Sequence, residues 1–272
     1  MKPEIIIALD FPTGKKALEF LDRFEAVEDK PWVKVGMELY YSEGPSILKE
    51  IKNRGYRIFL DLKLHDIPNT VGSAMKVMAG LGVDMVNVHA AGGSKMMEAA
   101  VKGFNEGREN AEGRKPLMIA VTQLTSTSEE LMNEELRIPG SLTDTVIAYA
   151  KNAKASGLDG VVCSAWEAGM IHENVGEDFM TITPGIRLAG DAAGDQSRIA
   201  TPARAKELGS DYLVIGRSIT AADDPVAAYR RCVEELLYIT ENRHNKNSIW
   251  RMTCQRRLTR LQRACLISKQ YF

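Results

Sequence analysis

Opposite charges alternate along residues 59–70, FLDLKLHDIPNT, in a stretch that is otherwise apolar. Side chains on a strand alternate between two faces, so we expect Asp61 and Lys63 to point the same way. Asp66 comes shortly before a proline, which suits the first turn of a helix, and Lys34 lies near the end of another apolar run. Buried charges are costly unless they are paired or do chemical work, and a buried ion network stabilises a fold less well than apolar packing. The pattern therefore favours chemistry by charged groups over a purely structural salt-bridge network.

Eight short apolar runs, most of them continuous rather than alternating in polarity, must position these side chains. Such runs are typical of parallel strands covered on both faces, and the amphipathic stretches between them predict helices. Eight strand–helix units in about 240 residues predict a single α/β domain, a (β/α)8 or TIM barrel, whose active site lies at the carboxyl ends of the strands. The lack of a GxGxxG motif after the first run argues against a doubly wound sheet. The predicted strands are residues 5–10, 32–36, 56–63, 84–90, 116–123, 159–164, 179–185 and 211–216.

The charge distribution divides the chain in two. Of the 35 basic and 36 acidic residues, eight basic and one acidic lie in residues 241–272, which leaves 27 basic and 35 acidic in residues 1–240. An acidic body argues against general nucleic-acid binding. We expect residues 1–240 to form the catalytic barrel. We expect residues 241–272 to form a basic C-terminal tail outside the barrel, which we treat as a candidate for non-native sequence and to which we assign no function.

The remaining composition indicates in which cellular compartment we expect the protein. No run of 18 apolar residues occurs, so we expect no membrane span. The N-terminus lacks the long apolar region and small-residue cleavage site of a signal peptide. The four cysteines show no CxxC motif and no metal-ligand spacing, which favours free thiols in a reducing cytoplasm.

Several motifs occur in an order that resembles one enzyme family. DLKLHDIPNT contains the pattern DxKxxD, and ALD (8–10), VKVG (33–36), QLTS (123–126), PGIR (184–187) and IGRSI (215–219) accompany it at matching spacing. Together they resemble the orotidine 5′-monophosphate decarboxylase family over about residues 4–237. The resemblance implies a cofactor-independent decarboxylation of orotidine 5′-monophosphate to uridine 5′-monophosphate and CO2, without a metal. It also implies a homodimer.

The resemblance assigns catalytic roles to four charged residues. Removing CO2 from C6 of the pyrimidine leaves a carbanion in the ring plane, which electrostatics must stabilise because no cofactor accepts the electrons. Lys63 would stabilise this carbanion and then protonate it. Asp61, together with Asp66 from a partner subunit, would lie near the departing carboxylate and raise the energy of the ground state. Lys34 would keep the aspartates ionised and reach a ribose hydroxyl.

The resemblance also implies a set of substrate contacts. Thr125 would read the pyrimidine edge, and Pro184 would lie against the base. In the expected lid over residues 183–202, Arg187 and Gln196 would close on the phosphate, with Gly216 and Arg217 as the rest of its site. Asp10 would bind the ribose hydroxyls, although it could instead cap the helix that begins near Thr13. The full set of predicted substrate contacts is Asp10, Lys34, Asp61, Asn69, Thr70, Thr125, Pro184, Arg187, Gln196, Gly216 and Arg217, with Asp66, Asn69 and Thr70 extending toward the partner subunit.

Three other functions stay open on the sequence. A metal-dependent sugar-phosphate decarboxylase or aldolase of the same superfamily can carry DxKxxD, but the position of Lys34 is typically acidic there, and a lysine opposes a metal site. A Schiff-base aldolase is a weaker alternative, because Lys63 flanked by carboxylates would be protonated. The third is a non-catalytic nucleotide-binding protein, or an RNA-binding protein that acts through the tail.

Overall fold

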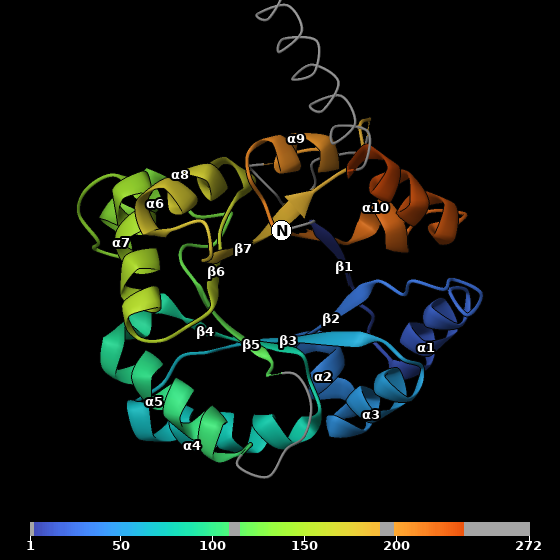
Figure 1. Ribbon diagram of the computed structural model, residues 1–272, viewed down its shortest axis with the longest axis horizontal. Helices are drawn as coiled ribbons and strands as arrows, with labels where there is room; N and C mark the ends of the chain where they lie inside the picture. Colours follow the sequence, from blue (N-terminus) through green and yellow to red (C-terminus); the bar gives the residue numbers. More distant parts are fainter. Residues whose placement is uncertain (1–2, 109–114, 191–198, 237–272) are drawn as a thin grey trace, which may run out of the picture.

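Eight parallel strands form a closed ring at the centre of the computed structural model, and helices surround it (Figure 1). The structure describes residues 3–108, 115–190 and 199–236. The predicted basic tail, residues 241–272, lies outside these ranges. The strands are β1 (Glu4–Ala8), β2 (Trp32–Gly36), β3 (Arg57–Leu64), β4 (Met85–His89), β5 (Leu117–Val121), β6 (Gly160–Val162), β7 (Met180–Ile186) and β8 (Tyr212–Ile215).

Each strand pairs in parallel with the next one along the chain, and β1 closes the ring by pairing with β8. The order β1 to β8 around the ring is that of a (β/α)8 barrel. The predicted fold class and all eight predicted strands are therefore confirmed. The register shifts twice, between Leu60 and Leu64 of β3 and between Thr183 and Ile186 of β7, and both irregularities lie at the carboxyl end of the barrel.

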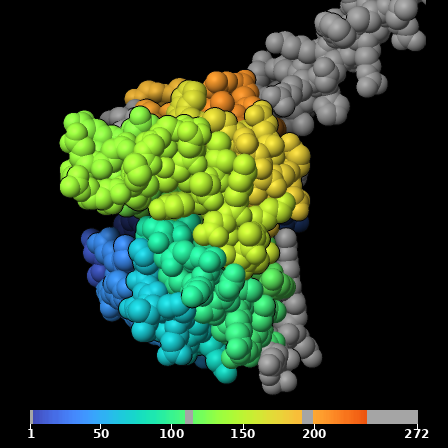
Figure 2. All heavy atoms as spheres, turned by 90° about the vertical axis from the view of Figure 1, so that its left-hand side faces the viewer, coloured from blue at the N-terminus to red at the C-terminus, as the bar shows by residue number. Residues whose placement is uncertain are grey.

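Helices follow the strands on the outside of the ring. In Figure 2, which views the left-hand side of Figure 1, α4 and α5 form the lower part of the outer wall, and α7 and α8 form the upper part. No helix in the described ranges is long and apolar enough to cross a membrane. The helices are α1 (Gly14–Asp22), α2 (Met37–Glu43), α3 (Pro45–Asn53), α4 (Pro68–Met78), α5 (Gly93–Glu106), α6 (Glu129–Glu134), α7 (Leu142–Ala155), α8 (Ala165–Val175), α9 (Pro202–Glu207) and α10 (Arg217–Thr220), with short 3-10 turns η1 (Ala79–Leu81) and η2 (Ala90–Gly92) and a further helical segment over residues 225–236.

Side-chain caps fix where several of these helices begin. Thr13 accepts a hydrogen bond from the backbone N of Lys16, and Ser128, Ser141 and Thr201 do the same at the starts of α6, α7 and α9. Such caps satisfy amides that have no partner within the helix. Asp10 is therefore not the cap of α1, and that alternative is wrong.

Apolar side chains form two separate layers. Inward-facing residues such as Ile6, Phe59 and Ile182 fill the inside of the ring, whereas outward-facing residues such as Val86 and Val88 pack beneath the helices. The inner layer stops short of the carboxyl ends of the strands. Polar side chains replace apolar ones there, and these ends carry the site.

Candidate active site

A cavity of about 840 Å³ opens at the carboxyl ends of the strands. Inward-facing apolar residues form its floor, among them Ala8, Phe59, Ile182 and Val214. Polar residues from the strand ends and following loops form its wall. Nine of the predicted site residues line the cavity: Asp10, Lys34, Asp61, Lys63, Thr125, Pro184, Arg187, Gly216 and Arg217.

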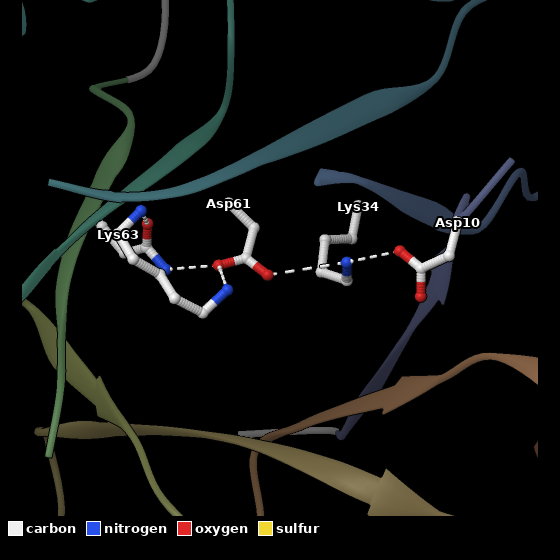
Figure 3. Close-up of polar contacts among 5 residues, drawn as sticks. Asp10, Lys34, Asp61 and Lys63 are labelled. Carbon is white, nitrogen blue, oxygen red and sulfur yellow. Dashed lines mark hydrogen bonds and ion pairs between the residues drawn. The ribbon is translucent and has the colours of Figure 1, made fainter. Parts of the chain in front are cut away.

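Four charged side chains, one from the loop after β1 and three from β2 and β3, form one continuous row, which we call the charged array: Asp10, Lys34, Asp61 and Lys63 (Figure 3). Lys63 Nζ lies 2.7 Å from Asp61 Oδ1. Lys34 Nζ lies 3.5 Å from Asp61 Oδ2 and 2.9 Å from Asp10 Oδ1. Anions and cations alternate along the array, so each inner charge has an opposite charge on both sides.

Burial makes these charges depend strongly on one another, because the side chains of Asp61 and Lys34 are only 10% and 13% exposed. Burial alone would raise the pKa of Asp61, but the ammonium groups of Lys34 and Lys63 outweigh it and hold that pKa below its usual value. Burial would likewise lower the pKa of Lys34, but Asp61 and Asp10 outweigh it and raise that pKa. Both groups are therefore charged at neutral pH.

Lys63 does not follow the regular alternation that we expected for β3. Its φ is 53°, in the left-handed region that residues with side chains rarely adopt. Between Leu60 and Leu64 the strand carries two more residues than the facing part of β4, between Val86 and Val88. The expectation that Asp61 and Lys63 meet is confirmed by their ion pair, but regular pleating is the wrong reason. The irregularity in β3 sets the direction of the Lys63 side chain.

Gly36 leaves room for the array at the end of β2. A Cβ at this position would lie 3.0 Å from Lys34 Nζ and 3.5 Å from Asp10 Oδ1. A side chain there would push the ammonium away from at least one of its two carboxylates. The final glycine of VKVG thus has a role in the site that the sequence pattern alone did not reveal.

The opposite side of the cavity carries arginines. Arg187 follows β7, is 9% exposed, and donates from Nη1 to the carbonyl oxygen of Ile186 at 2.9 Å. Gly185, with a φ of 81°, makes the turn between Pro184 and Arg187, a conformation that favours glycine. Arg217 lies at the first position of α10, directly after Gly216.

Three predicted residues lie outside the cavity of the single chain. Asp66, Asn69 and Thr70 are exposed at the start of α4, and Asp66 Oδ1 accepts a hydrogen bond from the backbone N of Ile67. Among the described residues no ion pair joins Asp66 to another side chain, so its expected action in the site of a partner subunit stays a prediction. Gln196 lies outside the described residues, together with the rest of residues 191–198 in the middle of the expected lid.

The sequence assigned no role to two further groups of residues, although QLTS (123–126) was among the motifs. Gln123 lines the cavity and is 6% exposed, and Leu124 and Ser126 line it beside Thr125. Asn87 is 1% exposed on β4, donates from Nδ2 to Asp61 Oδ1 at 2.7 Å, and accepts from the backbone N of Lys63 at 2.8 Å. The available signal was polar residues, Asn87 and His89, at alternate positions of a strand whose other residues are apolar.

Fold and site together define a class of protein: a (β/α)8 barrel with a charged cavity suited to an anionic substrate. The chain matches the Orotidine 5'-phosphate decarboxylase / HUMPS family over residues 3–232. It therefore belongs to this family.

Similar proteins agree with this membership. Proteins of Bacillus cytotoxicus and Bacillus mycoides, both named Orotidine 5'-phosphate decarboxylase, are 57% identical over 230 residues, which is 85% of this chain and 95% of each relative. The crystal structure of Orotidine 5'-phosphate decarboxylase from Lactobacillus acidophilus matches with a TM-score of 0.77 at 42% identity, over 86% of this chain and 99% of that chain. An uncharacterized conserved protein from Geobacillus kaustophilus matches with a TM-score of 0.76 at 50% identity, over 85% and 99% of the two chains.

Proposed function

We propose that this protein is a carboxy-lyase that converts orotidine 5′-monophosphate to uridine 5′-monophosphate and CO2 in pyrimidine biosynthesis. Membership of the family and relatives of that name support the reaction. The observation that carries it in this chain is the charged array, whose cation Lys63 lies 2.7 Å from Asp61 at the cavity wall. Charges fixed before the substrate arrives stabilise a developing carbanion without reorganising.

The reaction breaks one C–C bond and forms one C–H bond. The C6–carboxylate bond breaks, CO2 leaves, and its bonding electron pair stays on C6. The ammonium of Lys63 stabilises this pair and then donates a proton to C6, and the neutral amine regains a proton from water. Asp61 lies near the departing carboxylate, where repulsion between like charges raises the energy of the bound substrate.

The far end of the substrate binds at the opposite wall. Arg187, Arg217 and the backbone at Gly216 hold the phosphate, for which the planar donor fork of arginine is suited. Asp10 and Lys34 contact the ribose, Thr125 the pyrimidine edge, and Pro184 one face of the base. Gln196 would add a phosphate contact. Binding energy from the distant phosphate then helps to force the carboxylate against Asp61.

A metal-dependent sugar-phosphate reaction is not favoured by this arrangement. A divalent cation in such a site is bound by oxygen ligands, chiefly carboxylates whose negative charge it balances. Lys34 Nζ already lies between the carboxylates of Asp10 and Asp61, at 2.9 and 3.5 Å. The ammonium therefore occupies the position that the metal would need. Independence from any cofactor is part of our proposal.

The decisive experiment mixes chelator-treated protein with orotidine 5′-monophosphate and follows the loss of ultraviolet absorbance. We expect conversion by the wild type and none by Lys63→Ala. Lys154→Ala is the matched control, because Lys154 also forms a 2.8 Å ion pair, with Asp178, but lies outside the cavity. Retention of most of the rate by Lys63→Ala would overturn the assignment.

We further propose that the site is completed by a second copy of the chain, whose Asp66 and Thr70 reach the array. Two observations support this: both residues are exposed beside the cavity without lining it, and the adjacent Ile67 is 66% exposed. Mixing Lys63→Ala with Asp66→Ala subunits tests it. If Asp66 acts across the interface, hybrid dimers contain one intact site and regain activity. If Asp66 acts within its own subunit, no hybrid site is intact and activity stays absent.

The cytoplasmic location stays a prediction. Cys163 and Cys232 are both buried, and the predicted compartment is one in which cysteines stay reduced. Fractionation of cells that express the protein would test this location.

A further inference from the structure

Asn87 makes two hydrogen bonds that join the two reacting charges of the array. It lies inside the barrel on β4, next to β3, and is 1% exposed. Its Nδ2 donates to Asp61 Oδ1 at 2.7 Å, the same oxygen that receives Lys63 Nζ. Its Oδ1 accepts from the backbone N of Lys63 at 2.8 Å. One carboxamide therefore contacts the side chain of the anion and the main chain of the cation.

The backbone of Lys63 needs such support. Among the described residues, only Lys63 and Arg137 combine a side chain with a positive φ, and Arg137 is exposed in a loop. A left-handed conformation is unfavourable for a residue with a Cβ, and it persists where surrounding contacts determine it. Here the register shift of β3 creates the conformation, and the Asn87 carboxamide accepts the Lys63 amide hydrogen within it.

We propose that Asn87 is a positioning residue, which holds the Asp61 carboxylate and the Lys63 backbone in the relative geometry that the decarboxylation requires. This inference rests on the proposed function. Asn87 does not line the cavity, so it acts through Asp61 and Lys63 rather than on the substrate. A carboxamide is suited to this task because it offers a donor to the anion and an acceptor to the amide from one rigid plane.

A purely structural residue would give a different result on substitution. Asn87→Leu removes both hydrogen bonds at similar volume and frees the ammonium to move relative to Asp61. Small misplacements of reacting groups cost about 100-fold in rate, so we expect kcat to fall by about that factor with KM nearly unchanged, because the phosphate and ribose contacts lie elsewhere. Val86→Ala is the matched control. It lies next to Asn87 on β4 but faces the helices, so it should lower the melting temperature and leave kcat intact.

Asn87→Asp provides a second readout, a pH profile of kcat, which is measured at a temperature where the variant is fully folded at every pH. It keeps the acceptor for the Lys63 amide but places a second carboxyl group against Asp61, and two such groups share a proton because both cannot stay ionised at that distance. The shared proton takes the place of the N–H that the Asn87 carboxamide donates to Asp61 in the wild type. The ratio of variant to wild-type kcat should therefore rise as the pH falls, whereas the ratio for Asn87→Leu should stay flat. The other titratable groups around this position are Lys63, Lys34, His89 and His65, and the ratio to wild type cancels their contribution.

The outcomes separate this inference from the proposed function. A wild type that does not convert orotidine 5′-monophosphate removes the proposed function, and the inference with it. An active wild type with a folded Asn87→Leu variant that keeps its kcat overturns the inference alone. If Asn87→Leu fails to fold, the isosteric Asn87→Asp decides: a kcat ratio that rises toward low pH supports positioning, and a flat ratio overturns it.

Discussion

Replacing Asp61 by asparagine should make the enzyme bind its substrate more tightly and turn it over more slowly. Asparagine has the same shape and removes the negative charge. It also replaces by an NH2 donor either the oxygen that faces Lys34 or the oxygen that accepts from Lys63 and Asn87. Lys34 keeps its 2.9 Å pair with Asp10, so we expect the fold to survive. The change tests the repulsion between the Asp61 carboxylate and the carboxylate of the substrate.

The size of this repulsion follows from the geometry. The charged groups of the array lie 2.7–3.5 Å apart, and the Asp61 side chain is 10% exposed. A substrate carboxylate placed against the array lies about 4 Å from Asp61, where two like charges repel by about 4 kcal/mol at an effective dielectric constant of about 20. Screening by the neighbouring lysines reduces this to about 2–4 kcal/mol. We therefore expect a fall in kcat of about 30- to 1000-fold.

The assay compares two ligands that differ by one carboxylate. When chemistry is slow, KM approaches the dissociation constant, so KM for orotidine 5′-monophosphate should fall in Asp61→Asn. The inhibition constant of uridine 5′-monophosphate, which lacks the carboxylate, should stay near the wild-type value. A fall in kcat with KM unchanged or raised would refute ground-state repulsion by Asp61 and leave only a role in orienting Lys63.

Three further predictions follow from individual side chains. Gly36→Ala should lower kcat/KM by about tenfold with little loss of melting temperature, because the added Cβ would lie 3.0 Å from Lys34 Nζ. Gly80→Ala is the control because the space around Gly80 is open, and equal activity of the two variants would contradict crowding of the array. Gly185→Ala should lower the free energy of unfolding by about 1 kcal/mol, because φ is 81° there, and denaturant unfolding measures this loss. The change should also weaken phosphate binding through Arg187, and inhibition by the product measures that effect. The hydrogen bond to Asp211 raises the pKa of His172 to about 9 from 6.5. The pair therefore stabilises the fold fully below about pH 6.5, and this stabilisation is lost as the pH rises toward 9. The melting temperature of the wild type should fall across this range more than that of His172→Gln, and parallel curves would show that the pair contributes nothing.

Much of this protein could be predicted from its sequence, because its signals are local. Eight continuous apolar runs predict eight buried parallel strands, and a closed barrel then places every strand end at one rim. Asp10 falls at that rim just after β1, and Lys34 and Asp61 fall there on β2 and β3. Adjacent parallel strands bring such residues together whatever the chemistry.

The parts that could not be predicted depend on contacts between strands. A left-handed lysine has no sequence signature, because the conformation comes from the register shift between β3 and β4 rather than from the residue itself. The role of Asn87 follows from the same shift, which brings its side chain opposite the Lys63 amide. Asp66 shows a further limit: it is exposed just before α4 in the single chain, and its predicted role depends on a partner subunit, which the spacing within one chain cannot place.

In the reaction that we propose, the alternation of charge in the array would let this site favour the transition state over the bound substrate. Asp10 and Asp61 balance Lys34 and Lys63, so the empty array is neutral and its burial is tolerable. The bound substrate adds one negative charge beside Asp61. As the C–C bond breaks, that charge moves to C6, where Lys63 is its neighbour. The total charge is unchanged throughout, but it passes from beside an anion to beside a cation within one rigid array, and only an interaction that improves along this path raises kcat.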